Sequence, residues 1–142
     1  MSSTEELVLD ASVAVVWGFE DEADPLAETL LDRMPTVRAY VPALWPLEVA
    51  NVLLVGERRK RISAADTAQF LALLGTFPIA IDEETTSRAW GDTLGLARAH
   101  GLSVYDASYI ELAMRRGLPL ATLDAKLGAA AAAVGVALYA AP

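Results

Sequence analysis

The sequence predicts an α/β fold of one domain, with a mainly parallel central sheet flanked by helices on both faces. Short apolar segments alternate along the chain with longer segments whose apolar residues recur at helical spacing. Hydrophobic residues make up 54% of the chain, a share expected when a sheet is buried on both faces. A chain of 142 residues suits one domain, and we assign residues 1–142 to it.

In the first half of the chain, the first predicted strand is Leu7–Asp10. The segment that follows it to Trp17 is assigned to a short helix, because Asp and Ser favour helix starts. Its β-branched residues would also suit a strand. Apolar spacing and flanking Pro or Ser residues predict the next elements, a strand at Val37–Val41 and helices at Pro25–Met34, Leu44–Arg59 and Ser63–Leu74.

In the second half, a third strand is predicted at Phe77–Ile81, followed by a helix at Asp82–Ala99. Asp106 is predicted to open the next helix, because Asp is a favoured N-cap, and Gly117 to end it. The remaining elements are a strand at Leu118–Leu123, a helix at Ala125–Ala133 and a short strand at Val136–Tyr139.

Composition narrows the possible functions. The chain has no cysteine, which excludes disulfides, thiolate metal sites and thiol catalysis and agrees with a reducing cytoplasm. The start lacks the pattern of a secretion signal, and the apolar tail is too short for a membrane span, so we expect a cytoplasmic protein. The formal net charge of −8 argues against a broad basic surface for nucleic acid. It does not argue against an enzyme that reaches a phosphate through metal ions.

Four acidic residues occupy positions where a shared site is expected. Asp10, Asp106 and Asp124 stand at strand ends or helix starts, which converge on one crevice in an open parallel sheet. Glu48 lies on an otherwise apolar helix. Each Asp alone is explained as a helix cap, and Glu48 with Asn51 as a solvated stripe. If the four converge, they raise one another's pKa, and a divalent cation removes that conflict. Oxygen ligands without Cys or clustered His select Mg²⁺ or Mn²⁺.

Four short segments make the sequence similar to a known family. In chain order these segments are Leu7–Ser12, Leu47–Leu53, Ser103–Ala107 and Leu120–Asp124. In this order the sequence resembles PIN-domain ribonucleases, and among them the VapC-type toxins of prokaryotic toxin–antitoxin pairs. The resemblance covers nearly the whole chain. It implies endonucleolytic RNA cleavage by a metal-activated water, with Mg²⁺ or Mn²⁺ as the cofactor.

The resemblance also implies a role for each matching residue. Asp10 and Asp106 fall on the most direct metal-ligand positions, while Glu48 and Asp124 complete the acidic pocket. The polar residues that match the hydrogen-bonding support of these acids are Ser12, Asn51 and Thr122.

The resemblance further implies three partners: an RNA substrate, a basic antitoxin that blocks the acidic pocket, and a second copy of the chain in a homodimer. The helices near Leu44–Leu74 contribute to the dimer and antitoxin contacts in that family. Candidate phosphate contacts are the basic residues of two segments, Arg58, Arg59, Lys60, Arg61, Arg115 and Arg116.

Two other classes stay open from the sequence. A phosphoacceptor receiver domain also gathers acids and Mg²⁺ at strand ends. Here, however, Asp10 has no acidic neighbour, Asp82 stands too late in the chain, and Lys126 lies inside a helix start. A non-catalytic PIN-like protein that dimerises and holds a partner agrees with the high apolar content.

Overall fold

The computed structural model describes residues 4–140 and contains one parallel four-stranded sheet with the order β3-β2-β1-β4. The strands are β1 (Glu5–Leu9), β2 (Val37–Val41), β3 (Ile79–Ile81) and β4 (Leu120–Ala121). All three strand pairings are parallel, and Leu138 adds an isolated parallel bridge to Leu120. The predicted α/β class with a mainly parallel sheet is confirmed. The ends of the predicted domain, residues 1–3 and 141–142, lie outside the described part.

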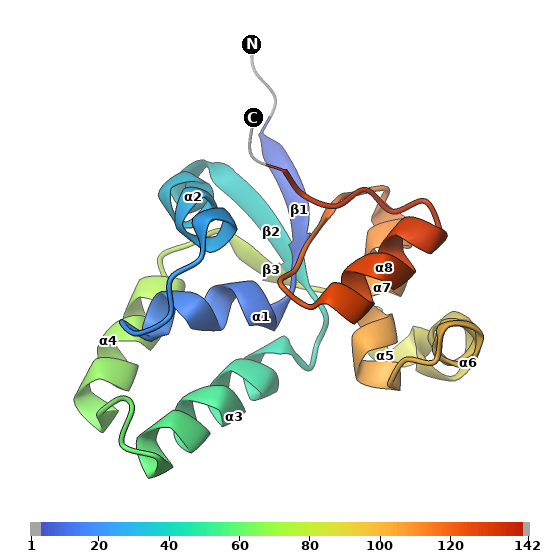
Figure 1. Ribbon diagram of the computed structural model, residues 1–142. Helices are drawn as coiled ribbons and strands as arrows, with labels where there is room; N and C mark the ends of the chain where they lie inside the picture. The colour runs from blue at the N-terminus through green and yellow to red at the C-terminus, as the bar shows by residue number, and fades with distance from the viewer. Residues whose placement is uncertain (1–3, 141–142) are drawn as a thin grey trace.

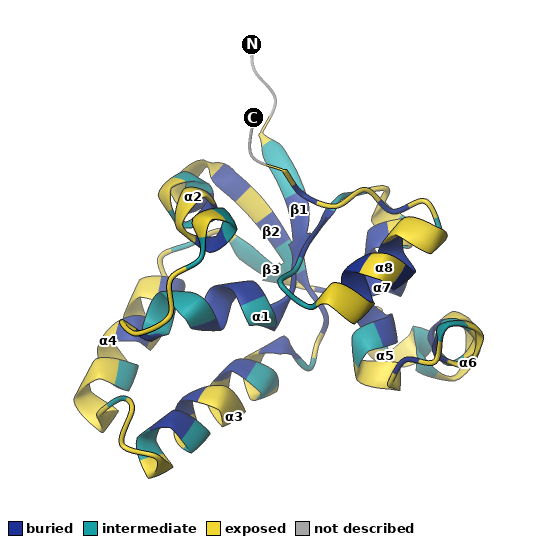
Figure 2. Ribbon diagram, viewed as in Figure 1, coloured by how far each residue is buried: buried dark blue, intermediate teal, exposed yellow. Residues whose placement is uncertain are grey.

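The helices form two groups, one on each side of the sheet (Figure 1). The first group is α1 (Ala11–Ala14), α2 (Pro25–Arg33), α3 (Trp45–Arg58) and α4 (Ala64–Leu74), with 3₁₀ turns at Val15–Gly18 and Met34–Thr36. The second group is α5 (Thr85–Arg88), α6 (Leu94–His100), α7 (Val104–Arg116) and α8 (Ala125–Ala133). Buried residues gather on β1, near the centre of the molecule, and on α7, which packs beside it (Figure 2). Between residues 4 and 140, no helix is long and apolar enough to cross a membrane.

Helix α7 starts earlier than predicted. Its N-cap is Ser103, whose Oγ accepts a hydrogen bond from the Asp106 N–H at 3.0 Å. Asp106 therefore lies inside the first turn, where a carboxylate interacts favourably with the helix dipole. Both Ser and Asp are good caps, so residue type alone did not choose between them. The correction leaves the Asp106 carboxylate without a capping role.

The predicted helix at Asp82–Ala99 is also wrong as a single element. The structure has α5, a π-helical turn at Ala89–Thr93 and α6, and the first of these begins at Thr85. Asp82 stays outside the helix because its buried carboxylate accepts hydrogen bonds from Thr85 and Arg115. Gly91 lies in the π-helical turn, and glycine weakens a regular helix there.

The predicted strands of the second half are longer than the observed ones. Of the predicted strand Leu118–Leu123, only Leu120–Ala121 forms a strand, because Pro119 has no N–H to donate to a neighbouring strand. Pro78 shortens the third strand in the same way, and the predicted final strand is reduced to the bridge at Leu138.

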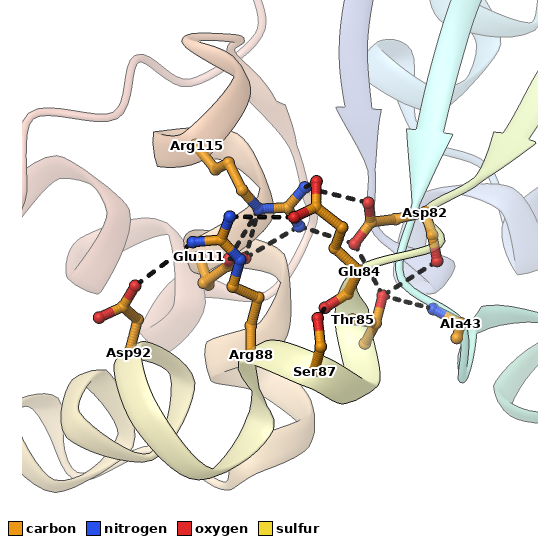
Figure 3. Close-up of polar contacts among 9 residues, drawn as sticks. All are labelled: Ala43, Asp82, Glu84, Thr85, Ser87, Arg88, Asp92, Glu111 and Arg115. Atoms are coloured by element: carbon orange, nitrogen blue, oxygen red, sulfur yellow. Dashed lines mark hydrogen bonds and ion pairs between the residues drawn. The ribbon is translucent and has the colours of Figure 1, made fainter.

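A buried ion-pair network joins α7 to the end of β3 and to α5 (Figure 3). The Arg115 guanidinium donates to both Asp82 oxygens at 2.7 and 3.1 Å, to Glu111 Oε1 at 2.8 Å and to Glu84 Oε2 at 3.3 Å. Side-chain exposure is 14% for Arg115, 1% for Asp82 and 6% for Glu111. This engagement corrects the prediction of Arg115 as a phosphate contact, because its donors are committed to carboxylates of the protein.

The same network sets the ionisation of Asp82. Burial raises the pKa of its carboxyl, but hydrogen bonds from Arg115 and Thr85 outweigh burial and hold that pKa below its usual value. Asp82 therefore stays ionised beside Arg115 down to acid pH.

Candidate active site

The structure brings the four predicted acids together at the carboxyl ends of the strands. Asp10 directly follows β1 and is 6% exposed. Glu48 lies in the first turn of α3, Asp106 lies in the first turn of α7, and Asp124 is the N-cap of α8. These last three carboxylates are half-buried. Four segments far apart in the sequence thus each contribute one carboxylate to one region.

The acids lie close enough that their charges raise the pKa of two of them, Glu48 and Asp106. Burial raises the pKa of Glu48, and the charges of Asp10 and Asp106 raise it further, against the lowering effect of a hydrogen bond from Tyr109. Burial likewise raises the pKa of Asp106, with added contributions from Asp124 and Asp10. The site is therefore an anionic cluster whose ionised form is unfavourable without a cation.

Two hydroxyl groups hold Asp10. The hydroxyls of Ser12 and Thr122 each donate to Asp10 Oδ2 at 2.7 Å. Ser12 Oγ in turn accepts from the Leu123 N–H, and Thr122 Oγ1 accepts from the Asp124 N–H, both at 3.0 Å. This web fastens the end of β4 to the end of β1. It leaves Asp10 Oδ1 without a hydrogen bond from any described residue.

Glu48 is held by a residue that the sequence did not single out. Tyr109 Oη donates to Glu48 Oε1 at 2.5 Å and accepts from the Ala11 N–H at 3.4 Å. Burial, and then the bond to Glu48, raises the pKa of Tyr109, so the phenol keeps its proton at neutral pH. Its one signal in the sequence is its place three residues after Asp106, on the same helix face. The side chain of Asn51, predicted to support the acids, is exposed and makes no hydrogen bond with another described residue, so its supporting role stays a prediction.

The donor chemistry fits a hard divalent cation. The four acids offer only carboxylate oxygens, which Mg²⁺ and Mn²⁺ accept, and a cation would relieve their repulsion. As the side chains stand, no group of three or more His, Cys, Asp or Glu residues in the described part is arranged to hold an ion. The charges of the neighbouring acids nevertheless reach Glu48 and Asp106, whose pKa values they raise.

The remaining predicted phosphate contacts lie away from the acids. Residues 58–60 are exposed at the far end of α3, about 15 Å along the helix axis from Glu48. Arg61 is paired with acidic side chains before α2 and lies over the Phe19 ring at 4.5 Å. Arg116 lies over the Tyr40 ring at 4.1 Å. Of the six predicted phosphate contacts, only Arg58, Arg59 and Lys60 have no ion-pair or cation–π partner in the described structure.

The raised pKa of Asp106 predicts a stability effect. When a carboxyl has a higher pKa in the native state than in the unfolded state, its ionisation destabilises the folded protein. The free energy of unfolding therefore falls as pH rises from the unfolded pKa, about 4, through the native pKa. We expect Asp106→Asn to increase the free energy of unfolding of the metal-free protein at pH 7 by roughly 0.5–1 kcal/mol. The gain should vanish below about pH 4, where Asp106 is protonated in both states. Denaturant unfolding at both pH values measures it.

Asp66 supplies the matched control for this prediction. It occupies the same place in the first turn of α4, where its N–H also donates to a capping serine, Ser63, at 3.0 Å. Asp66 is exposed and lies on a different helix from the acids. Asp66→Asn should therefore lower stability slightly, by about 0.3–1 kcal/mol, through the lost dipole interaction. Equal signs for the two variants would contradict the explanation by burial and like charges.

Comparison with known proteins bears on this arrangement. The model of the PIN domain family matches residues 7–133, which is most of the chain. Ribonuclease VapC3 of Pyrobaculum aerophilum is 31% identical over 122 residues, covering 86% of this chain and 92% of the relative. The family match excludes the receiver-domain alternative.

Solved structures share the fold. PAE2754 from Pyrobaculum aerophilum aligns with a TM-score of 0.67 and 24% identity, over 92% of this chain and 87% of that one. FitAcB from Neisseria gonorrhoeae aligns with a TM-score of 0.62 and 20% identity, over 94% and 96%. A toxin–antitoxin complex from Klebsiella pneumoniae aligns with a TM-score of 0.55 and 17% identity, over 83% and 86%. From the family match and the VapC3 identity together, this chain belongs to the PIN domain family.

Proposed function

We propose that this protein is a Mg²⁺- or Mn²⁺-dependent endoribonuclease that acts as the toxin of a toxin–antitoxin pair. The observation that carries the proposal is the convergence of four carboxylates from four separate segments. Their repulsion costs folding free energy, which a functional use of the site explains. Family membership and the similarity to Ribonuclease VapC3 support the same reaction class.

Each acid has a proposed role. Asp10 and Asp106 would be the direct ligands, while Glu48 and Asp124 would complete the pocket and orient water. A bound ion would lower the pKa of a water ligand and stabilise the charge that develops on the phosphate. The two hydroxyls that donate to Asp10 Oδ2 would fix the orientation of that carboxylate and leave its other oxygen available to an ion. RNA on either side of the cut would contact residues 58–60.

The protein partners are also proposals. An antitoxin would place a cationic side chain among the acids, where it would substitute for the metal charge. The solved toxin–antitoxin complex among the structural neighbours supports a partner of this kind. A homodimer is supported by apolar side chains that lie exposed, with Leu47 74%, Ile81 52% and Leu71 44% accessible. We place the activity in the cytoplasm, because that compartment holds the RNA substrate.

Metal removal and return test the reaction. We expect the chelator-treated protein to leave a labelled RNA intact and to cleave it internally after Mg²⁺ or Mn²⁺ is added. Asp106→Asn should stay inactive with either metal. Cleavage that persists in chelator would overturn the metal-dependent assignment. Calorimetric titration with Mn²⁺ separates a nuclease from a non-catalytic binding protein, since a chain without a metal site gives no saturable heat.

A further inference from the structure

We infer that Tyr109 is the positioning residue that holds Glu48 in the acidic site, an inference that rests on the proposed metal-dependent function. Its hydroxyl touches two segments that carry acids while its backbone belongs to a third. It donates to Glu48 of α3, accepts from the Ala11 N–H directly after Asp10, and stands on α7 three residues from Asp106. One phenol thus links three of the four acid-bearing segments.

Glu48 needs such a partner more than the other acids do. Asp10 is held by two hydroxyls, and Asp124 is held by the N–H groups of Lys126 and Leu127 at 2.9 and 3.1 Å. Glu48 has a longer side chain, and like charges repel it from the site. The Tyr109 hydroxyl is the one hydrogen-bond partner of its carboxylate among residues 4–140.

Tyr109 is built to hold a fixed position. Its side chain is 0% exposed and is among the largest fully buried side chains of the core. The ring therefore cannot swing, and a Tyr side chain has few rotatable bonds to order. The Ala11 N–H points at the phenol oxygen, which directs the phenol proton away from Ala11 and toward Glu48. The hydrogen bond to an ionised carboxylate is of the strong, charge-assisted kind.

Removing this hydroxyl should release Glu48 without disturbing the backbone. Tyr109→Phe keeps the ring in the core and deletes only the donor. Glu48 is then free to turn toward solvent, away from Asp10 and Asp106. We expect Mn²⁺ to bind the full-length, RNA-free variant about 10- to 100-fold more weakly than the wild type, measured by calorimetric titration.

Tyr139→Phe is the matched control. Tyr139 is also buried, at 7% exposure, and its hydroxyl donates to a glutamate, Glu5 Oε1, at 3.3 Å. Glu5 lies at the opposite end of β1 from Asp10. The same chemical change at that end should leave Mn²⁺ affinity unchanged.

A purely structural role of Tyr109 would give a different result for Tyr109→Phe. That variant would then have a lower unfolding midpoint without metal but an unchanged Mn²⁺ affinity.

A double-mutant cycle tests whether Tyr109 acts through Glu48. In a Glu48→Ala background, Tyr109→Phe should cause no further loss of Mn²⁺ affinity, whereas an additional loss of tenfold would contradict the inference. If Tyr109→Phe does not fold, Glu48→Asp replaces it as the test variant. The aspartate side chain is one methylene shorter, which withdraws the carboxylate from the phenol and should weaken Mn²⁺ binding to a similar extent.

Mn²⁺ titration of the wild type and of the variants separates the proposed function from the positioning role of Tyr109. Wild-type protein that gives no saturable Mn²⁺ heat overturns the proposed function. If the wild-type protein binds Mn²⁺ and Tyr109→Phe binds it equally well, only the positioning role is overturned. The same holds for Glu48→Asp where it replaces Tyr109→Phe.

Discussion

We expect Asp10→Asn to lower RNA cleavage at saturating Mn²⁺ on the order of 10³-fold while the protein stays folded. Both supporting hydroxyls, from Ser12 and Thr122, donate to the same oxygen of Asp10. An asparagine can present its single oxygen there and keep both hydrogen bonds. What it loses is the negative charge and the second oxygen, Oδ1, which accepts no hydrogen bond from a described residue. Single-turnover cleavage of a labelled RNA measures the effect.

The control for this prediction must carry the same change in net charge. Asp32→Asn does so on α2, where Asp32 is exposed and forms no ion pair within the described structure. It should cleave RNA at the wild-type rate within about twofold, since surface charges this exposed interact weakly. An Asp10→Asn protein that stays within tenfold of the wild type would refute the role of Asp10 as a metal ligand.

We expect Arg115→Met to lower the free energy of unfolding by about 3–5 kcal/mol, which is large beside the roughly 5–15 kcal/mol stability of a typical domain. The substitution leaves the almost fully buried Asp82 and Glu111 without the cation that pairs with both. Methionine fills the space of the side chain, so the loss reports the uncompensated charges rather than a cavity. Denaturant unfolding followed by circular dichroism measures it.

The neighbouring Arg116 gives the control. Arg116→Met removes the same charge from the next residue, but that side chain is exposed and only lies over the Tyr40 ring, so about 1 kcal/mol or less is expected.

The pH dependence of the Arg115 effect has a defined sign. The native pKa of Asp82 is lowered, so its ion pair adds stability above about pH 4 and loses it as pH falls through the native value. The gap between wild type and Arg115→Met should therefore narrow on acidification. A gap that stays constant to pH 3 would mean that Asp82 is not the partner that matters.

Local sequence signals predicted most elements of the fold. The strand at Val37–Val41 and the helix at Ala125–Ala133 match to the residue, because apolar runs and flanking breakers define them without tertiary help. The predicted start of a helix at Asp82 is wrong. Asp is a favoured capping residue, but Asp82 forms a buried ion pair with Arg115, which lies 33 positions later in the chain. A contact over that distance has no local signal.

By itself, the sequence determined that four acids fall at helix starts and strand ends of a parallel α/β chain without cysteine chemistry. Local patterns of apolar residues reveal the periods of helices and strands. The ends of parallel strands then lie at one edge of the sheet, which places residues at those ends near one another. Only the tertiary structure decided that the hydroxyl of Tyr109 donates to Glu48, and that Arg115 lies inside the protein rather than facing a substrate. The physical reason is that hydrogen bonds and ion pairs between distant segments depend on how helices pack. That packing fixes side-chain positions to within a few tenths of an ångström, which residue spacing does not encode.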